Sequence, residues 1–379
     1  MFDLVVVGSG FFGLTVAREA VDRLGLSVLI LEKRPHVGGN AYSYFDTETG
    51  IEIHKYGSHL FHTSNERIWD YVSRFTKFTN YEHRVWAKHR NQIYSMPINL
   101  STICSFYGKS LSPGEAIDMI EKCKEADTKD TYDNLEEKAI SLIGRPLYEA
   151  FIKGYSHKQW SADPRLIPAE VITRLPVRYN FDTRYFSDKY QGLPVDGYTA
   201  WIERMIDHPN IEMRLGTDYF EEASSFRGRV PILYTGPLDS FFDYEFGELG
   251  WRTLDFQLET LDIPDYQGTS VVNYSDLDVP FTRIHEYRHL HPERVYNESA
   301  TVIAKEFSSF AKKGDEPYYP MNLITDRTKL AKYKELAKAE KAVWFGGRLG
   351  SYKYLDMHMA IGGALKLFEN EILPFFKTV

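Results

Sequence analysis

The chain has 379 residues, 43% of them hydrophobic, and a formal net charge of −8. This length and composition predict two or three domains with buried cores, and the charge argues against a nucleic-acid-binding surface or a polybasic membrane patch. The apolar run at the N-terminus is too short for a signal or membrane segment. Because Cys104 and Cys123 lack metal-ligand and disulfide spacing, we expect a cytoplasmic protein without membrane insertion or a metal site.

The first forty residues predict a βαβ unit that binds a dinucleotide. An apolar strand at residues 4–7 leads into a G-x-G-x-x-G loop, a helix at 14–23 follows, and a second strand ends at Glu32. Gly8 permits the tight turn, Gly10 lets the backbone approach a pyrophosphate, and Gly13 lets helix and strand pack closely. The helix N-terminus offers free N–H donors to phosphates. Glu32 can accept hydrogen bonds from both ribose hydroxyls, which predicts an unphosphorylated ribose, as in FAD or NAD.

The residues after Glu32 favour FAD over NAD. Gly38, Gly39 and Asn40 continue from the acidic residue, and adjacent glycines suit a backbone that passes close to a bound flavin nucleotide. This extension resembles that of glutathione-reductase-like flavoproteins, in which FAD lies extended across the domain. We therefore expect FAD as the cofactor.

The rest of the chain predicts two further structural units. Residues 113–152 read as several short helices. Segments 230–234, 253–258, 269–274 and 282–287 read as strands of an antiparallel sheet beside the nucleotide domain. Near the end, an apolar strand at 343–348 meets a pair of glycines, and a helix at 357–370 follows, which suggests a return to the first domain.

The predicted fold class is α/β, with a Rossmann-like FAD-binding domain, a helical insertion and an antiparallel β-sheet domain interleaved in sequence. We assign the FAD-binding domain to residues 1–65, about 198–240 and 340–379, and the helical domain to about 100–165. The antiparallel sheet, or substrate, domain takes about 66–99, 166–197 and 241–339. No internal repeat is evident.

Arginines and tyrosines in the predicted loops suggest a pocket for a dianion. A diphosphate withdrawn from water needs paired charges, and arginine supplies bidentate donors. Any one arginine taken alone is better explained as a solvated or structural ion-pair residue. His59 follows a glycine, and its spacing alone favours a hydrogen-bonded core histidine. The residues considered are Arg174, Arg178, Tyr185, Arg283, Tyr318, Tyr319, Arg348 and Tyr354.

Several long blocks in collinear order resemble the bacterial UDP-galactopyranose mutases. They include HKYGSHLFHT at 54–63, LYEAFIKGYSHKQW at 147–160, DVPFTRIHEYRH at 278–289 and FGGRLGSYKYLDMH at 345–358. The resemblance implies a homodimeric FAD enzyme, active only when its flavin is reduced. Such an enzyme interconverts UDP-galactopyranose and UDP-galactofuranose without net redox change and supplies galactofuranose for cell-envelope glycans.

The resemblance also implies a mechanism and a set of site residues. The reduced flavin N5 attacks the anomeric carbon and displaces UDP, and the resulting flavin–sugar adduct opens and recloses the sugar ring. Arg174, Arg283 and His59 are the implied catalytic residues. The implied substrate-binding residues are Phe151, Tyr155 and Trp160 around the uracil, Asn273 at the nucleotide, and Arg174, Tyr185, Arg283, Tyr319, Arg348 and Tyr354 around the diphosphate.

The implied cofactor-binding residues extend the N-terminal fingerprint and add the glycine pair near the C-terminus. They are Gly8, Gly10, Phe12, Gly13, Glu32, Gly39, Asn40, His59, Gly347, Arg348, Asp356 and Met357. One position departs from the pattern, because some enterobacterial-type members have Asn where this chain has His83. Arg174 lies in the segment that resembles the family's mobile loop.

Two alternatives remain open from the residues. An amine-oxidase-like flavoenzyme would share the FAD fingerprint but would need an aromatic cage for an amine and no diphosphate pocket. A non-catalytic module that only senses UDP-sugars would bind the nucleotide sugar without changing it. The first is disfavoured by the Arg and Tyr blocks, and turnover distinguishes the second.

Overall fold

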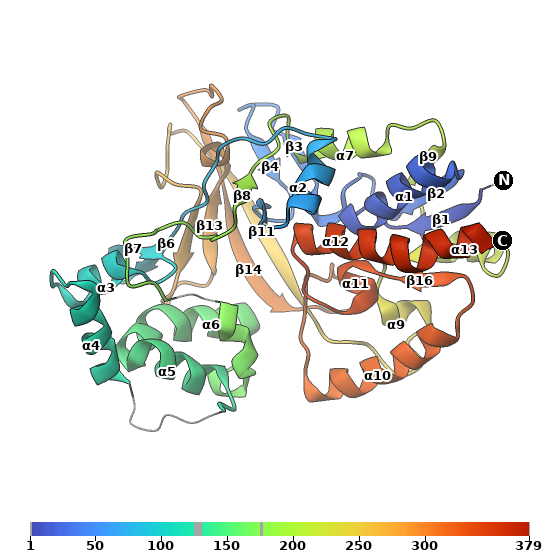
Figure 1. Cartoon of the computed structure of the whole chain (residues 1–379). Coiled ribbons are helices and arrows are strands. Elements are labelled where there is room, and N and C mark those ends of the chain that lie inside the picture. The colour runs from blue at the N-terminus through green and yellow to red at the C-terminus, as the bar shows by residue number, and fades with distance from the viewer. Residues whose placement is uncertain (1, 125–130, 175–176, 379) are drawn as a thin grey trace.

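The computed structural model describes residues 2–124, 131–174 and 177–378, without the side chains of residues 173 and 174. Its first layer is a sheet of five parallel strands (Figure 1). Strands β1, β2 and β10 are buried along their whole length, as expected for a parallel sheet covered on both faces. In sheet order the strands are β16 (Val343–Phe345), β10 (Ile232–Tyr234), β1 (Leu4–Val7), β2 (Val28–Glu32) and β9 (Ile211–Leu215).

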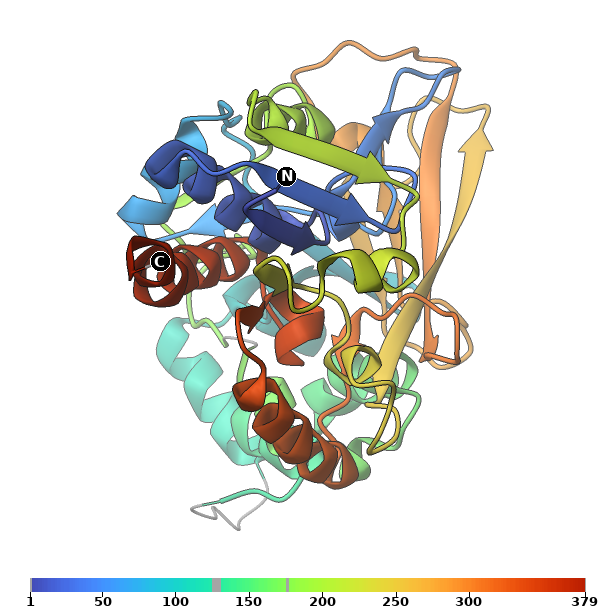
Figure 2. The ribbon, with the colours of Figure 1, turned by 90° about the vertical axis from the view of Figure 1, so that its right-hand side faces the viewer.

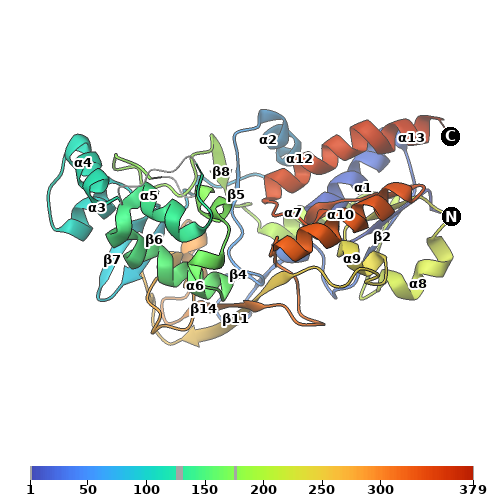
Figure 3. The same cartoon turned by 90° about the horizontal axis from the view of Figure 1, so that it is seen from below.

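Helices from distant parts of the sequence cover this sheet. On one face, α1 (Phe11–Leu24) contacts both α7 (Tyr198–Ile206) and α12 (Met357–Leu367). The two ends of the chain lie at the same end of the molecule (Figures 1 and 3). Tyr219, Phe226 and Phe241 pack on the other face. They come from α8 (Tyr219–Phe226) and α9 (Leu238–Phe241). The chain ends with η6 (Phe368–Ile372) and α13 (Leu373–Thr378).

A second sheet of seven strands stands beside the first (Figure 2). Its neighbours are antiparallel except for β12 and β6, which run parallel. The prediction that residues 230–234 belong to an antiparallel sheet is wrong, because β10 pairs in parallel with β1. In sheet order the strands are β15 (Tyr319–Pro320), β11 (Trp251–Leu261), β14 (Thr301–Phe310), β13 (Arg283–Glu286), β12 (Val271–Tyr274), β6 (Val85–His89) and β7 (Gln92–Met96).

A cluster of helices with its own apolar core packs against β6 and β7 (Figure 3). Its position agrees with the short helices predicted for residues 113–152, and a π-helical stretch interrupts it. The elements are α3 (Leu100–Tyr107), α4 (Pro113–Cys123), α5 (Leu135–Leu147), the π-helix η2 (Tyr148–Lys153), α6 (Gly154–Trp160), η3 (Pro164–Leu166) and η4 (Ala169–Arg174).

Short elements connect these three parts. The strand pairs β3–β4 and β5–β8 are antiparallel, and the turn between β4 and β5 contains His59. These connecting elements are η1 (Gly39–Ala41), β3 (Ser43–Phe45), β4 (Glu52–His54), β5 (Phe61–Thr63), α2 (Glu66–Ser73), β8 (Tyr190–Gly192), η5 (Tyr287–Leu290), α10 (Ile324–Ala339) and α11 (Gly347–Ser351).

The observed architecture confirms the predicted fold class, a Rossmann-like α/β unit combined with helices and a largely antiparallel sheet. In the described ranges, every helix is too short or too polar to cross a membrane.

Candidate active site

The glycine loop after β1 borders a cavity of about 1040 Å³, here called the glycine-loop cavity. Gly8 has φ +99°, and a Cβ there would lie 2.2 Å from Thr235 Oγ1. A Cβ on Gly13 would lie 2.2 Å from the carbonyl oxygen of Gly8, so helix α1 could not approach the loop. A Cβ on Gly10, by contrast, would meet no protein atom within 4 Å. The open space at Gly10 belongs to the cavity.

Glu32 lies at the end of β2 and borders the same cavity. Its Oε2 accepts hydrogen bonds from the backbone N–H and hydroxyl of Ser9 at 2.9 and 2.7 Å, and its Oε1 accepts from the Arg34 N–H at 3.0 Å. These three bonds fix the carboxylate beside the N-terminus of α1, whose unpaired N–H groups favour an anion.

The residues of this cavity fit an extended dinucleotide. Anion-binding donors, an open backbone at Gly10 and a carboxylate at the strand end occur along one hollow. Of the residues expected to bind the cofactor, all but Asp356 line it, namely Gly8, Gly10, Phe12, Gly13, Glu32, Gly39, Asn40, His59, Gly347, Arg348 and Met357. Asp356 instead lines a second cavity.

The second cavity has a volume of about 720 Å³ and lies between the helical cluster, the seven-stranded sheet and the turn that carries His59; we call it the arginine–tyrosine cavity. Nine of the residues expected to bind the substrate line it, although they come from six different parts of the chain. They are Phe151, Tyr155, Trp160, Tyr185, Asn273, Arg283, Tyr319, Arg348 and Tyr354. The side chain of Arg174 lies outside the described residues, and only its backbone, at the end of η4, is placed.

Aromatic side chains from η2 and α6 form one end of the arginine–tyrosine cavity. Phe151 and Tyr155 are four residues apart, so they lie on the same face of the helical segment. Phe151 is held firmly, because its ring packs edge-on against Tyr94 at 5.0 Å and Phe106 at 5.7 Å. Trp160 ends α6 and is only partly buried, so its ring can contact a ligand.

The cationic end adjoins Tyr155 and is built on the second sheet. Asn273 and Arg283 are cross-strand partners on β12 and β13, so both side chains lie on the same face. Arg283 donates to the Tyr155 hydroxyl, and its Nε lies 3.3 Å from Glu306 Oε1. Burial alone would lower the pKa of Arg283, but Glu306 overcomes this effect and the pKa is raised. Arg283 is therefore a permanent cation in a largely buried position.

Arg348 provides a second cation beside two tyrosines. Its guanidinium lies 5.7 Å from the ring of Tyr319 and 5.3 Å from the ring of Tyr354, and the two rings stack 5.7 Å apart. It donates to the carbonyl oxygens of Tyr318 and Leu355 at 3.2 and 2.7 Å. These acceptors fix the guanidinium without cancelling its charge.

The two cavities meet at five shared residues. Burial and the nearby charge of Arg348 lower the pKa of His59 to about 4, against the effect of a 2.7 Å hydrogen bond from Nδ1 to the Gly57 carbonyl. His59 is therefore a neutral imidazole. A ligand in the glycine-loop cavity and one in the arginine–tyrosine cavity would approach each other at these residues, which are Asn40, His59, Met321, Arg348 and Met357.

Sequence reasoning missed three residues of the site. The first two are Glu306 and His285. Glu306 is 3% exposed and accepts a hydrogen bond from His285 at 3.0 Å. His285 in turn lies 2.7 Å from the hydroxyl of Ser58, the residue before His59. His62 also lines the arginine–tyrosine cavity. The strand pattern gave a signal for Glu306, because it is a charged residue on the same face of β14 as buried Ala304. His83, whose role the sequence left open, lines this cavity too, and burial lowers its pKa to about 3.

The fold and these adjoining cavities define a nucleotide-binding enzyme of the Rossmann-like class. A family model for UDP-galactopyranose mutase matches residues 150–354, and one for an NAD(P)-binding Rossmann-like domain matches residues 6–75. The chain is 43% identical to a probable UDP-galactopyranose mutase of Klebsiella pneumoniae, over 96% of this chain and 93% of that protein. The chain belongs to the UDP-galactopyranose mutase family, and it is a mutase.

Two further comparisons bear on the substrate and on the fold. The chain is 42% identical to a dTDP-fucopyranose mutase of Escherichia coli, over 97% of both proteins. A solved structure of reduced UDP-galactopyranose mutase superposes with a TM-score of 0.76 at 14% identity, covering 99% of this chain and 94% of that one. The family assignment favours a mutase over the amine-oxidase-like and sensor alternatives.

Proposed function

We propose that this mutase is an FAD enzyme, active with its flavin reduced, that interconverts UDP-galactopyranose and UDP-galactofuranose. We further propose that it works as a cytoplasmic homodimer and supplies galactofuranose for cell-envelope glycans. The observation that carries the proposal is the meeting of the two cavities at His59 and Arg348. One cavity fits a dinucleotide, and the other combines an aromatic end with a cationic end, as a nucleoside diphosphate sugar requires.

The aromatic end would bind the base. Stacking of a base on an aromatic ring contributes about 1–3 kcal/mol. Phe151, Tyr155 and Trp160 supply such rings, and the Asn273 amide borders the same cavity at the start of the cationic end. The Asn273 Oδ1 is buried and has no hydrogen-bond partner among the described residues, so it can accept a hydrogen bond from the nucleotide.

The cationic end would bind the diphosphate and stabilise its charge as it leaves the sugar. When bound and reduced, the flavin would supply a nucleophile for the anomeric carbon, so that UDP can depart and then return to the same carbon once the sugar ring has reclosed on its other hydroxyl. Arg283 and Arg348 would hold the departing diphosphate, and cations placed before the bond breaks favour that transition state. Tyr185, Tyr319 and Tyr354 would add hydroxyl groups around the oxygens, and Arg174 would approach from its loop.

His59 would act as a neutral hydrogen-bonding group at the cavity junction. Its Nδ1 donates to the Gly57 carbonyl, so its Nε2 carries a lone pair. With a pKa of about 4, the ring is not a proton donor at neutral pH.

Turnover with a reductant tests the proposal directly. Purified protein loaded with FAD is incubated with UDP-galactofuranose, with and without dithionite, and UDP-galactopyranose is followed by chromatography. We expect conversion only in the reduced sample. Absence of conversion in both samples, with FAD bound, would contradict the proposal.

The relative at 42% identity supports a second candidate substrate, dTDP-fucopyranose and its furanose form. This substrate differs by a methyl group on the base and by the absence of both the ribose 2′-hydroxyl and the sugar 6-hydroxyl. The same assay with dTDP-fucofuranose distinguishes the two, because the preferred substrate is the one with the higher kcat/KM.

A further inference from the structure

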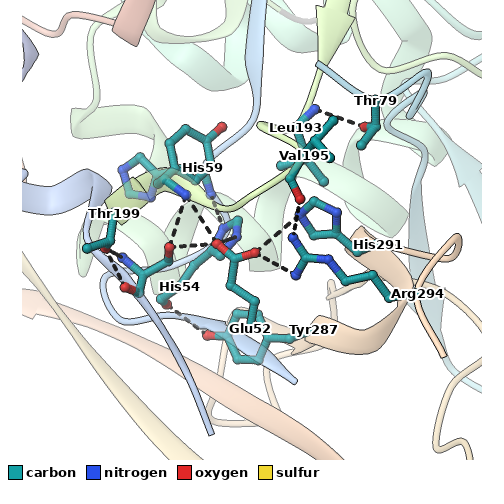
Figure 4. A network of polar contacts seen from close by, with 12 residues as sticks. Glu52, His54, His59, Thr79, Leu193, Val195, Thr199, Tyr287, His291 and Arg294 are labelled. Atoms are coloured by element: carbon teal, nitrogen blue, oxygen red, sulfur yellow. Dashed lines mark hydrogen bonds and ion pairs between the residues drawn. The ribbon is translucent and has the colours of Figure 1, made fainter. Parts of the chain in front are cut away.

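A buried carboxylate supports the turn that carries His59 (Figure 4). Glu52 on β4 is 1% exposed and lies outside the lining of both cavities. Its Oε2 accepts from Arg294 Nη1 at 2.8 Å and lies 3.3 Å from His291 Nε2. Its Oε1 accepts from the Ser43 hydroxyl at 2.6 Å. The network therefore lies behind the reaction site and not in it.

Burial and neighbouring groups determine the charges of Glu52 and His54. Burial alone would raise the pKa of Glu52, but His54, Ser43, His291 and Arg294 hold it below its ordinary value, so Glu52 is an anion. Burial lowers the pKa of His54 to about 3, against the attraction of Glu52, so His54 is neutral. A neutral imidazole carries one proton, on either Nδ1 or Nε2.

Hydrogen bonding decides which nitrogen of His54 carries the proton. The backbone N–H of His59 donates to His54 Nδ1 at 3.0 Å, so Nδ1 must be the bare nitrogen. The proton is then on Nε2, which lies 3.9 Å from Glu52 Oε1. An anion on that side favours the proton on the nearer nitrogen. The charge of Glu52 thereby maintains the acceptor that holds the His59 backbone.

His59 itself has a fixed tautomer. Its Nδ1 lies 2.7 Å from the Gly57 carbonyl oxygen, which can only accept, so Nδ1 carries the proton and Nε2 is bare. On the other side of the turn, the Ser58 hydroxyl bonds to His285 at 2.7 Å. The turn is held from both sides, and His59 lines both cavities.

We propose that Glu52 is a positioning residue for the reaction: through the tautomer of His54 it fixes His59, whose bare Nε2 serves as a hydrogen-bond acceptor for the N–H that the flavin gains on reduction. This inference rests on the proposed function, because it requires a bound flavin. An acceptor at that point stabilises the reduced flavin over the oxidised one. Glu52 therefore raises the midpoint potential of the bound FAD.

The first test is the midpoint potential of FAD in Glu52→Gln. The amide keeps the size of the side chain but removes the charge, and its NH₂ group opposes a proton on His54 Nε2. We expect full FAD content and a roughly tenfold lower ratio of reduced to oxidised flavin at a fixed external potential. For a two-electron couple this is a shift of about 30 mV to more negative potential. We also expect kcat to fall while the KM for the nucleotide sugar stays unchanged.

Variants of His54 test the step through its tautomer. In His54→Asn the amide oxygen can accept a hydrogen bond from the His59 N–H, and this acceptor does not depend on which atom carries a proton. The midpoint potential should therefore stay at the wild-type value. In His54→Leu the acceptor is absent, and the potential should shift as in Glu52→Gln. Adding Glu52→Gln to His54→Asn should cause no further shift. These variants keep the inference testable if Glu52→Gln folds poorly.

Glu286→Gln is the matched control. Glu286 is also a fully buried carboxylate, but it accepts from the N–H groups of Tyr266 and Gln267 at 2.9 and 2.8 Å, and among the described residues its carboxylate has no hydrogen bond or ion pair with His54. Its substitution should leave the potential unchanged. The inference would be overturned if FAD-loaded Glu52→Gln had the wild-type midpoint potential, or if Glu286→Gln shifted the potential equally. Either result would leave the proposed function standing. A wild-type protein that binds no FAD would overturn the proposed function as well.

Discussion

Arg283 keeps a positive charge where most of its side chain is withdrawn from water. Its side chain is 29% exposed, and the carboxylate of Glu306 beneath it is 4% exposed. Glu306 also accepts from His285 and from the Thr282 hydroxyl, so it stays ionised despite its burial. Glu306 thus balances part of the charge of the guanidinium, and both residues line the arginine–tyrosine cavity.

This arrangement predicts the effect of Arg283→Met. The variant lacks a fixed cation at the diphosphate. It also leaves Glu306 as a buried anion without a cationic partner, and this anion repels the diphosphate. Because loss of one transition-state donor costs roughly 10²–10³ in rate, we expect kcat/KM to fall by at least about 100-fold, with FAD still bound. Steady-state kinetics and calorimetric titration with UDP measure both effects.

Arg214→Met is the control for this substitution, because Arg214 is on β9 and forms a surface ion pair with Glu212. Its kcat/KM and UDP affinity should equal those of the wild type. If Arg283→Met changed both kcat/KM and UDP affinity by less than twofold, Arg283 would not bind the diphosphate.

At the scale of elements, two glycines of one loop have separate roles. A Cβ on Gly13 would collide with the Gly8 carbonyl oxygen at 2.2 Å, whereas a Cβ on Gly10 meets open cavity and its φ of −69° suits any residue. We expect Gly13→Ala to lower both the melting temperature of the FAD-free protein and its FAD affinity. Gly10→Ala should keep the melting temperature and weaken FAD binding by about tenfold or more. Scanning calorimetry and FAD fluorescence titration separate the two results, and tight FAD binding by Gly10→Ala would contradict the assignment of this cavity.

Lys158 on α6 ties the helical cluster to the hairpin that carries Asn273 and Arg283. Its ammonium donates to the carbonyl oxygens of Tyr274, Asp276, Val279 and Phe281 at 2.7, 2.8, 3.0 and 3.0 Å. Burial lowers its pKa to about 8, against the attraction of Asp276 and Asp278. One side chain thus closes the whole β12–β13 loop.

We therefore expect Lys158→Met to destabilise the protein by about 2–4 kcal/mol, because several carbonyls lose a charged donor. It should also weaken UDP binding, since Arg283 begins the strand after this loop. Lys153→Met is the control, because Lys153 is exposed in the preceding helical turn. Chemical denaturation gives the first quantity and UDP titration the second; equal stability of the two variants would contradict the role of Lys158.

The elements also show how far the sequence could predict the site. The glycine loop and Glu32 were readable because they lie in one short βαβ unit, where local spacing determines geometry. The pair Arg283 and Glu306 depends on the β13–β14 register, which joins residues far apart in the chain. Residues 230–234 were misplaced because a short apolar run has no periodicity that distinguishes a parallel from an antiparallel strand.

At the scale of the whole molecule, the site exists only where three parts of the fold meet. The helical cluster supplies rings, the seven-stranded sheet supplies Arg283 and Asn273, and the glycine loop borders the other cavity. The residues at the junction are consequently surrounded by protein on several sides. Burial lowers the pKa of His59 at this junction to about 4, and it lowers the pKa values of His54 behind the junction and of His83 in the arginine–tyrosine cavity to about 3.

These histidines predict that the protein loses stability in mild acid. Each has an unfolded-state pKa near 6.5 and a lower folded-state pKa, so below pH 6.5 the unfolded chain binds more protons than the folded one. The free energy of unfolding should therefore fall as the pH decreases from about 6.5 towards 4, by at most about 1.4 kcal/mol per pH unit for each histidine. His83→Gln should reduce this slope by one such contribution, and His157→Gln, at an exposed position on α6, is the control variant. Denaturation curves at pH 7, 6, 5 and 4.5 measure the slope, and equal slopes for wild type and His83→Gln would mean that His83 is protonated in the folded protein.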